Sequence, residues 1–157
     1  MSRYRSLLSG LLAIITIALV SCGSPTVKEP PKYTAAQIEQ LSGYAASLSA
    51  VEDRTRTELS GLIEKEDWTY VRNFIRGPLG SIRQTMSLVS QNLLLPSERK
   101  AALAQAREVF AHLEDIDKAA QDKNVVAARA EFRQSLTEFD AFLDLIPDAS
   151  VLDTPAS

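Results

Sequence analysis

The stretch VVAARAEFRQSLTEFDAFLDLIP, residues 125–147, decides the fold class of this chain. Its apolar residues recur at intervals of three and four, the spacing that places side chains on one face of an α-helix. The predicted stripe comprises Val125, Ala128, Phe132, Leu136, Phe139, Leu143 and Ile146. Proline cannot continue a helix, so this helix is expected to end at Pro147. Because no alternating strand pattern occurs after Thr34, the sequence predicts an all-α protein.

Three further segments with the same spacing precede this one. The first opens at TAAQ, residues 34–37, where the Thr34 hydroxyl and the Gln37 side chain should form a capping box. The second begins after Asp67, a suitable N-cap, and ends before Pro96. The two apolar stripes comprise Ile38, Leu41, Ala45, Leu48, Val51, Thr55, Leu59 and Leu62, and then Trp68, Val71, Ile75, Leu79, Ile82, Met86, Val89 and Leu93.

The third segment is expected to be capped by Ser97 and to end where QDKN turns the chain at Asn124. Its stripe comprises Leu103, Ala106, Phe110, Leu113, Ile116 and Ala120. Because the joints between the four segments are short, neighbouring helices should run antiparallel. The sequence thus predicts an up-down-up-down four-helix bundle over residues 34–147, followed by a flexible tail at 148–157.

The second segment contains an interruption, FIRGPLGSIR, residues 74–83. Glycine costs about 1 kcal/mol and proline about 3 kcal/mol in a helix interior relative to alanine, so local propensity does not explain the choice. Gly77 and Gly80 would let another backbone approach closely, and Pro78 would kink the helix. The bend then serves either the packing of the helix around its own core or the docking of a partner.

The N-terminus is typical of an exported lipoprotein. Arg3 and Arg5 precede an uncharged apolar run of 14 residues, 7–20, whereas a membrane-spanning helix needs roughly 20. The run ends in LVSC, residues 19–22, which resembles the lipobox cut by signal peptidase II. We therefore expect a signal peptide at 1–21, a lipidated Cys22 and a Pro-rich tether through residue 33. The alternative for Cys22 is a small buried apolar residue.

The charge balance excludes one class of partner. The whole chain has a formal net charge of -3, and removal of residues 1–21 leaves 15 basic and 20 acidic side chains. A chain with this acidic balance has no electrostatic reason to bind nucleic acid.

The sequence contains few residues that could form a catalytic site. The chain has one histidine and one cysteine, and it lacks a Gly-rich phosphate loop, a CxxC motif and an HExxH motif. We therefore predict no enzymatic activity and no required cofactor. His112 with Glu108 and Asp115 could bind a divalent metal such as zinc, since these spacings share a helix face; the alternative is a solvated polar face. Haem ligation by Met86 and His112 is disfavoured because Met86 falls in the apolar stripe.

A candidate protein-docking site lies around the interruption. Trp, Tyr and Arg are favoured at binding hot spots, and Tyr70, Arg72, Arg76 and Arg83 gather there with Trp68. The alternatives are a core position for Trp68, and pairing of the arginines with carboxylates on neighbouring helices.

Several stretches together resemble the cyanobacterial PsbQ-like family: the lipobox, the Pro-rich tether, DWTYVRNFIRGPLGSIRQ at 67–84, AREVFAHLEDIDKAAQDKN at 106–124 and FDAFLDLIP at 139–147. The resemblance implies a four-helix bundle and a lipid-anchored extrinsic subunit of photosystem II on the lumenal side of the thylakoid membrane. It further implies a role in stabilising the oxygen-evolving complex, near the antenna protein CP47 and the extrinsic manganese-stabilising protein. Cys22 is the one functional residue that the resemblance transfers. The competing hypothesis is a metal-binding lumenal or periplasmic lipoprotein on the same bundle.

Overall fold

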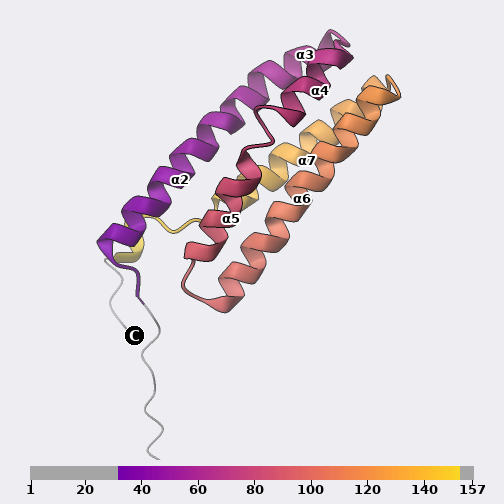
Figure 1. Cartoon of the computed structure of the whole chain (residues 1–157). Helices are drawn as coiled ribbons and strands as arrows, with labels where there is room; N and C mark the ends of the chain where they lie inside the picture. The colour runs from indigo at the N-terminus through magenta and orange to yellow at the C-terminus, as the bar shows by residue number, and fades with distance from the viewer. Residues whose placement is uncertain (1–31, 153–157) are drawn as a thin grey trace, which may run out of the picture. The chain divides into compact units, whose positions relative to one another are not determined.

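The computed structural model describes residues 32–152, and their regular structure is entirely helical (Figure 1). The predicted all-α class is thus confirmed for this range, and none of its helices is long and apolar enough to cross a membrane. The predicted signal peptide, Cys22 and all but the end of the predicted tether lie outside the described residues. In chain order the elements are α2 (Ala35–Arg54), the π-helix η1 (Thr55–Leu59), α3 (Ser60–Glu64), α4 (Trp68–Arg76), α5 (Ile82–Asn92), α6 (Pro96–Gln121), α7 (Val125–Leu143) and the 3-10 helix η2 (Ala149–Leu152).

Elements α2, η1 and α3 follow one another without a break and begin at the predicted capping box. The Gln37 N–H donates to the Thr34 hydroxyl oxygen at 3.3 Å, and the Thr34 N–H donates to the Gln37 side chain at 2.9 Å. These two bonds satisfy backbone donors that the first turn leaves without a helical partner.

The π-helix η1 is a feature that the sequence pattern does not reveal. The hydroxyl groups of Thr55 and Thr57 donate to the backbone carbonyls of Val51 and Asp53, at 2.8 and 2.9 Å. Such bonds compete with the regular helical ladder, and a π-turn accommodates one extra residue. The apolar stripe therefore shifts by one position beyond η1, so that Ile63 is buried whereas the predicted Leu62 is only half-buried.

The predicted second helix is divided into two helices rather than kinked. Asp67 caps α4 through the Tyr70 N–H, as predicted, and α4 ends at Gly77. Residues 77–81 form turns, in which the Leu79 N–H reaches back to the Phe74 carbonyl at 3.2 Å. Proline has no N–H to donate at position 78, so the helical ladder stops there.

Local signals set the boundaries of α6 and α7, with one correction. Asn124 caps α7 by accepting from the Ala127 N–H at 3.0 Å. The N-cap of α6 is Leu95, not the predicted Ser97, because Pro96 occupies the first helical position. Glu98 closes this end by accepting from the Leu95 N–H at 3.2 Å.

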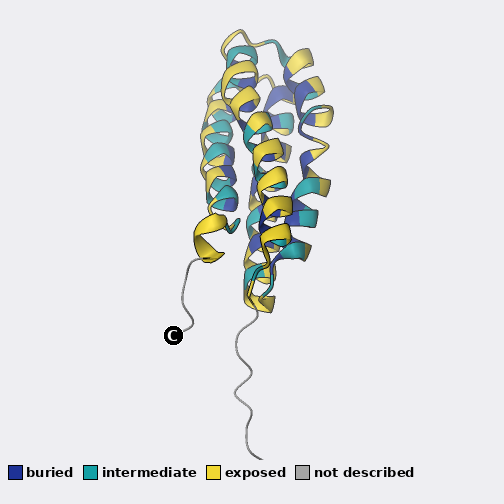
Figure 2. Ribbon diagram, turned by 90° about the vertical axis from the view of Figure 1, so that its left-hand side faces the viewer, coloured by how far each residue is buried: buried dark blue, intermediate teal, exposed yellow. Residues whose placement is uncertain are grey.

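One core joins all the long helices. Helix α6 packs against α7, α5 and α4, while α2 packs against α5 and α7, and α3 packs against α7 and α4. Figure 2 shows the buried positions on the inward sides of the ribbons and the exposed positions outside. Residues 149–152, predicted as tail, form η2 and contact α2.

Two predicted stripes are partly out of phase with the core. In α6 the predicted Leu103 is 41% exposed, while its neighbour Ala102 is fully buried. In α7 Phe142 is fully buried, whereas the predicted Leu143 is only half-buried. A straight α-helix drifts by about 20° per heptad against a strict seven-residue repeat, so over helices of this length the buried face rotates by roughly 50–75° and positions near the ends of a stripe leave it.

Candidate docking surface

Two of the predicted docking arginines bind one carboxylate of α6. The Arg72 Nε lies 3.2 Å from Asp117 Oδ1, and an Arg76 terminal nitrogen lies 2.9 Å from Asp117 Oδ2. Burial by itself would raise the pKa of Asp117, but hydrogen bonds from Arg76, Gln121 and Arg72 leave its pKa lowered. This cluster holds α4 against α6.

Arg83 on α5 also contacts α6, but at the surface. Its guanidinium lies over the Phe110 ring, 3.9 Å from the ring centroid. Its distance to the Glu114 carboxylate is 3.5 Å, and both side chains are largely exposed. Exposed pairs contribute about 0–1 kcal/mol, so the ring contact is the firmer of the two. All three arginines therefore meet α6, which is the alternative stated from sequence.

The two aromatic residues predicted near these arginines differ in exposure. Trp68 is half-buried and packs against the core. Tyr70 is 61% exposed, and its hydroxyl makes no hydrogen bond with any residue between 32 and 152.

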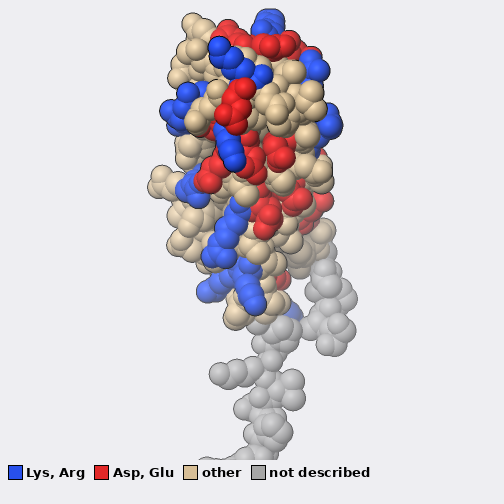
Figure 3. Space-filling view, turned by 90° about the vertical axis from the view of Figure 1, so that its right-hand side faces the viewer, with Lys and Arg blue, Asp and Glu red and all other residues tan. Residues whose placement is uncertain are grey.

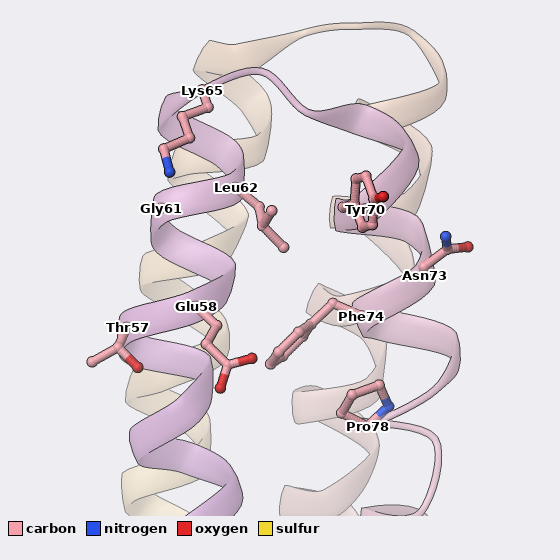
Figure 4. A pocket seen from close by; sticks show the side chains of 9 residues that line it. All are labelled: Thr57, Glu58, Gly61, Leu62, Lys65, Tyr70, Asn73, Phe74 and Pro78. Atoms are coloured by element: carbon pink, nitrogen blue, oxygen red, sulfur yellow. The ribbon is translucent and has the colours of Figure 1, made fainter.

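Tyr70 lies at the edge of a groove of about 550 Å³, with η1 and α3 on one side and α4 on the other. Figure 4 shows Leu62 and Phe74 pointing from opposite sides into this groove. The lining residues are Thr57, Glu58, Gly61, Leu62, Lys65, Tyr70, Asn73, Phe74 and Pro78. The spacing of the sequence does not reveal this groove, because η1 sets which side chains of η1 and α3 face α4.

The predicted metal ligands do not come together. His112 Nδ1 lies 2.7 Å from a Glu131 oxygen on α7, so the histidine pairs across the α6–α7 contact. Glu108 and Asp115 are exposed. No group of three or more His, Cys, Asp or Glu side chains within 32–152 is placed to hold a metal ion. Met86 is fully buried among apolar residues of the core.

One polar cluster was not foreseen. Glu52 is 6% exposed on the inner side of α2, and Arg56 bonds both Glu52 and Asp140 of α7, the latter at 2.6 Å. Burial is the main cause of the raised pKa of Glu52, and the hydrogen bond from Arg56 is the main cause of the lowered pKa of Asp140. The sequence does contain one signal of this cluster: Glu52 lies four residues after Leu48 and three before Thr55, so it shares their helix face.

Comparison with known proteins settles the family. The family model described as "PsbQ: Oxygen evolving enhancer protein 3" matches residues 2–147. The chain belongs to the PsbQ family. Within it, the chain is 41% identical over 150 residues to the protein "CyanoQ" of Synechocystis sp., covering 96% of this chain and 100% of that protein. The resemblance noted from the sequence is thereby confirmed.

Proposed function

We propose that this PsbQ-family chain is a non-catalytic extrinsic subunit of photosystem II on the lumenal side of the thylakoid membrane. In this role it stabilises the oxygen-evolving complex and its assembly. The observation that carries the proposal is the family match over residues 2–147, supported by 41% identity to CyanoQ along nearly the whole chain.

We also propose that the helices form the predicted up-down-up-down four-helix bundle. The first member is α2 with η1 and α3, the second is α4 with α5, and the third and fourth are α6 and α7. Short joints at 65–67, 93–95 and 122–124 support this arrangement, since such joints favour antiparallel neighbours.

The test of the function is co-purification. A tagged form of this chain, expressed in its own cells, should be recovered with photosystem II after detergent solubilisation, together with CP47 and the manganese-stabilising protein. An untagged strain controls for adhesion to the resin. Recovery of the tagged chain without any photosystem II subunit would refute the proposal.

Cys22 is proposed to carry the lipid anchor that holds the protein at the membrane. The variant Cys22→Ser should not be lipidated or cleaved, because a serine hydroxyl cannot replace the sulfur in the thioether. Detergent phase partitioning and mass spectrometry of the N-terminus measure this. A serine variant that is processed and partitions like the wild type would exclude the anchor.

For docking, we propose the exposed Tyr70 and its groove, with Arg72, Arg76 and Arg83 beside it. Arg72 and Arg76 also hold Asp117, so their replacement changes stability as well as binding. Tyr70→Ala is the cleaner test, because the exposed side chain bonds nothing within 32–152. Its recovery with photosystem II should fall while its helical content remains unchanged; equal recovery would place docking elsewhere.

A further inference from the structure

The charges of the described residues are unevenly distributed. Between Asp67 and Glu108 there are six basic residues and one acidic residue, Glu98, a net charge of +5. The rest of residues 32–152 contains eight basic and seventeen acidic residues, a net charge of -9. In Figure 3 basic side chains gather near the lower end of the visible face, beside an area of acidic side chains. Helices α4 and α5 and the first half of α6 thus form a basic region in an acidic protein.

Three cations of this region remain available to a partner. Arg72 and Arg76 are held by Asp117, and Arg99 donates to the carbonyls of Leu93 and Leu94. By contrast, the exposed side chains of Lys100 and Arg107 make no ion pair or hydrogen bond with the part of the chain that the structure describes. Arg83 lies over the Phe110 ring, and its one carboxylate partner within 32–152 is the exposed Glu114, at 3.5 Å. We call Arg83, Arg107 and Lys100 the basic row.

The row follows the contact between α5 and α6. Lys100 and Arg107 are seven residues apart, which places them on one face of α6 about 10 Å from each other. Arg107 lies one turn before Phe110, whose ring is covered by Arg83. Leu103, 41% exposed, lies between Lys100 and Arg107 on the same side of the helix. The row therefore combines three cations with an apolar residue.

A hollow of about 540 Å³, whose lining residues other than Arg83 are uncharged, lies on the outer side of α5. Its lining comprises Gly80, Arg83, Gln84, Ser87, Leu88 and Gln91. Over residues 77–97 Arg83 is the single charged residue, although 24% of the whole chain is charged. A centre without charges bordered by charged residues is the composition of a protein interface.

Stability of the protein itself does not account for the row. Lys100 lies near the N-terminal end of α6, where the helix dipole disfavours a cation. Neither Lys100 nor Arg107 has a carboxylate partner within 32–152.

We propose that the basic row and the hollow along α5 bind an acidic segment of a protein partner. Carboxylates of the segment meet the row, and its uncharged part lies against α5 and Leu103. The inference rests on the proposed function, since the partner is taken to be a subunit of photosystem II. A hollow with a mostly uncharged lining beside three cations fits a protein segment better than it fits a lipid surface, and guanidinium groups pair with carboxylates in a planar, two-point geometry.

The test uses the full chain, expressed in cells from which the wild-type protein has been deleted. The variant Lys100→Gln/Arg107→Gln removes two cations of the row, and Lys123→Gln/Arg133→Gln removes two exposed cations elsewhere. Retention on affinity-purified photosystem II is measured over a series of sodium chloride concentrations. We expect the row variant to be bound about tenfold less tightly at low salt and the control to match the wild type, with the difference shrinking as salt screens the charges.

Zero-length crosslinking with a carbodiimide identifies the occupant, because it joins the Lys100 amino group directly to a carboxylate. The expected product links Lys100 to an Asp or Glu of a photosystem II subunit. Crosslinks to a second copy of this chain alone, or binding to vesicles with anionic lipid that the row variant loses, would overturn the proposal. If the row variant and the wild type are retained equally on photosystem II, the basic row is not the docking surface, and the proposed function is unaffected. If the wild type is not retained at all, the proposed function itself is refuted.

Discussion

Asp117 illustrates how single residues join helices that are distant in sequence. It accepts from Arg72 and Arg76, 45 and 41 residues earlier in the chain. The sequence identified the two arginines as unusual but could not name their partner, because several carboxylates on α6 were equally available. The tertiary structure selects Asp117 because it is the carboxylate of α6 that faces α4.

We predict that Asp117→Asn lowers the free energy of unfolding at pH 7 by roughly 1 kcal/mol, since a neutral amide binds guanidinium groups more weakly. The lowered pKa of Asp117 means that its contribution is present above the ordinary carboxyl pKa and is lost as the pH falls through the folded value. Urea unfolding of both proteins at pH 7 and in acid measures this. The wild type should lose more stability on acidification than the variant, and parallel losses would contradict the assignment.

At the scale of elements, the break between α4 and α5 depends on glycine. A Cβ atom added at Gly80 would lie 2.7 Å from the Arg76 carbonyl oxygen, a backbone atom that cannot easily move away. A Cβ atom added at Gly43, within α2, would meet nothing within 4 Å. Intrinsic helix propensity is the same for glycine at both positions, and only their surroundings distinguish them.

We therefore predict opposite effects for two identical substitutions. Gly80→Ala should destabilise the protein by about 1–3 kcal/mol, because the backbone must shift. Gly43→Ala should stabilise it by about 0.5–1 kcal/mol, because alanine is the better helix former at an open position. Thermal or urea unfolding decides the matter, and a Gly80→Ala protein as stable as the wild type would mean that the turn at 77–81 tolerates a side chain.

Residues 32–152 share one apolar core to which each long helix contributes. Phe139, predicted from the sequence, is 2% exposed in this core, whereas Leu103, also predicted, is 41% exposed. Both residues fit the helical spacing of the sequence, but only Phe139 is buried in the core.

Phe139→Ala is expected to cost about 3–5 kcal/mol, because it removes buried surface and leaves a cavity. Leu103→Ala should cost less than about 1 kcal/mol, because a partly exposed side chain loses little on truncation. Circular dichroism during urea unfolding would show a single cooperative transition for both. If the two variants lost similar amounts of unfolding free energy, Leu103 would contribute to the core as Phe139 does, and the buried face assigned to α6 would be wrong.

The sequence by itself determined the helices and most of their ends, because these depend on residues close together in the chain. Thr34 and Asp67 act as caps as predicted, the chain turns at Asn124, and it leaves the helical path at Pro78 and before Pro96. Each of these signals acts through backbone groups within a turn or two of the residue itself.

Only the tertiary structure decided which helix faces are buried and which charges remain unpaired. A one-residue shift at η1, the division at 77–81 and the drift of long helices alter the phase of the stripes, as at Leu103. The partner of Arg83 lies 31 residues away, and the availability of Lys100 and Arg107 depends on where every carboxylate lies. These properties arise from contacts between distant segments, on which the spacing of residues along one helix carries no information.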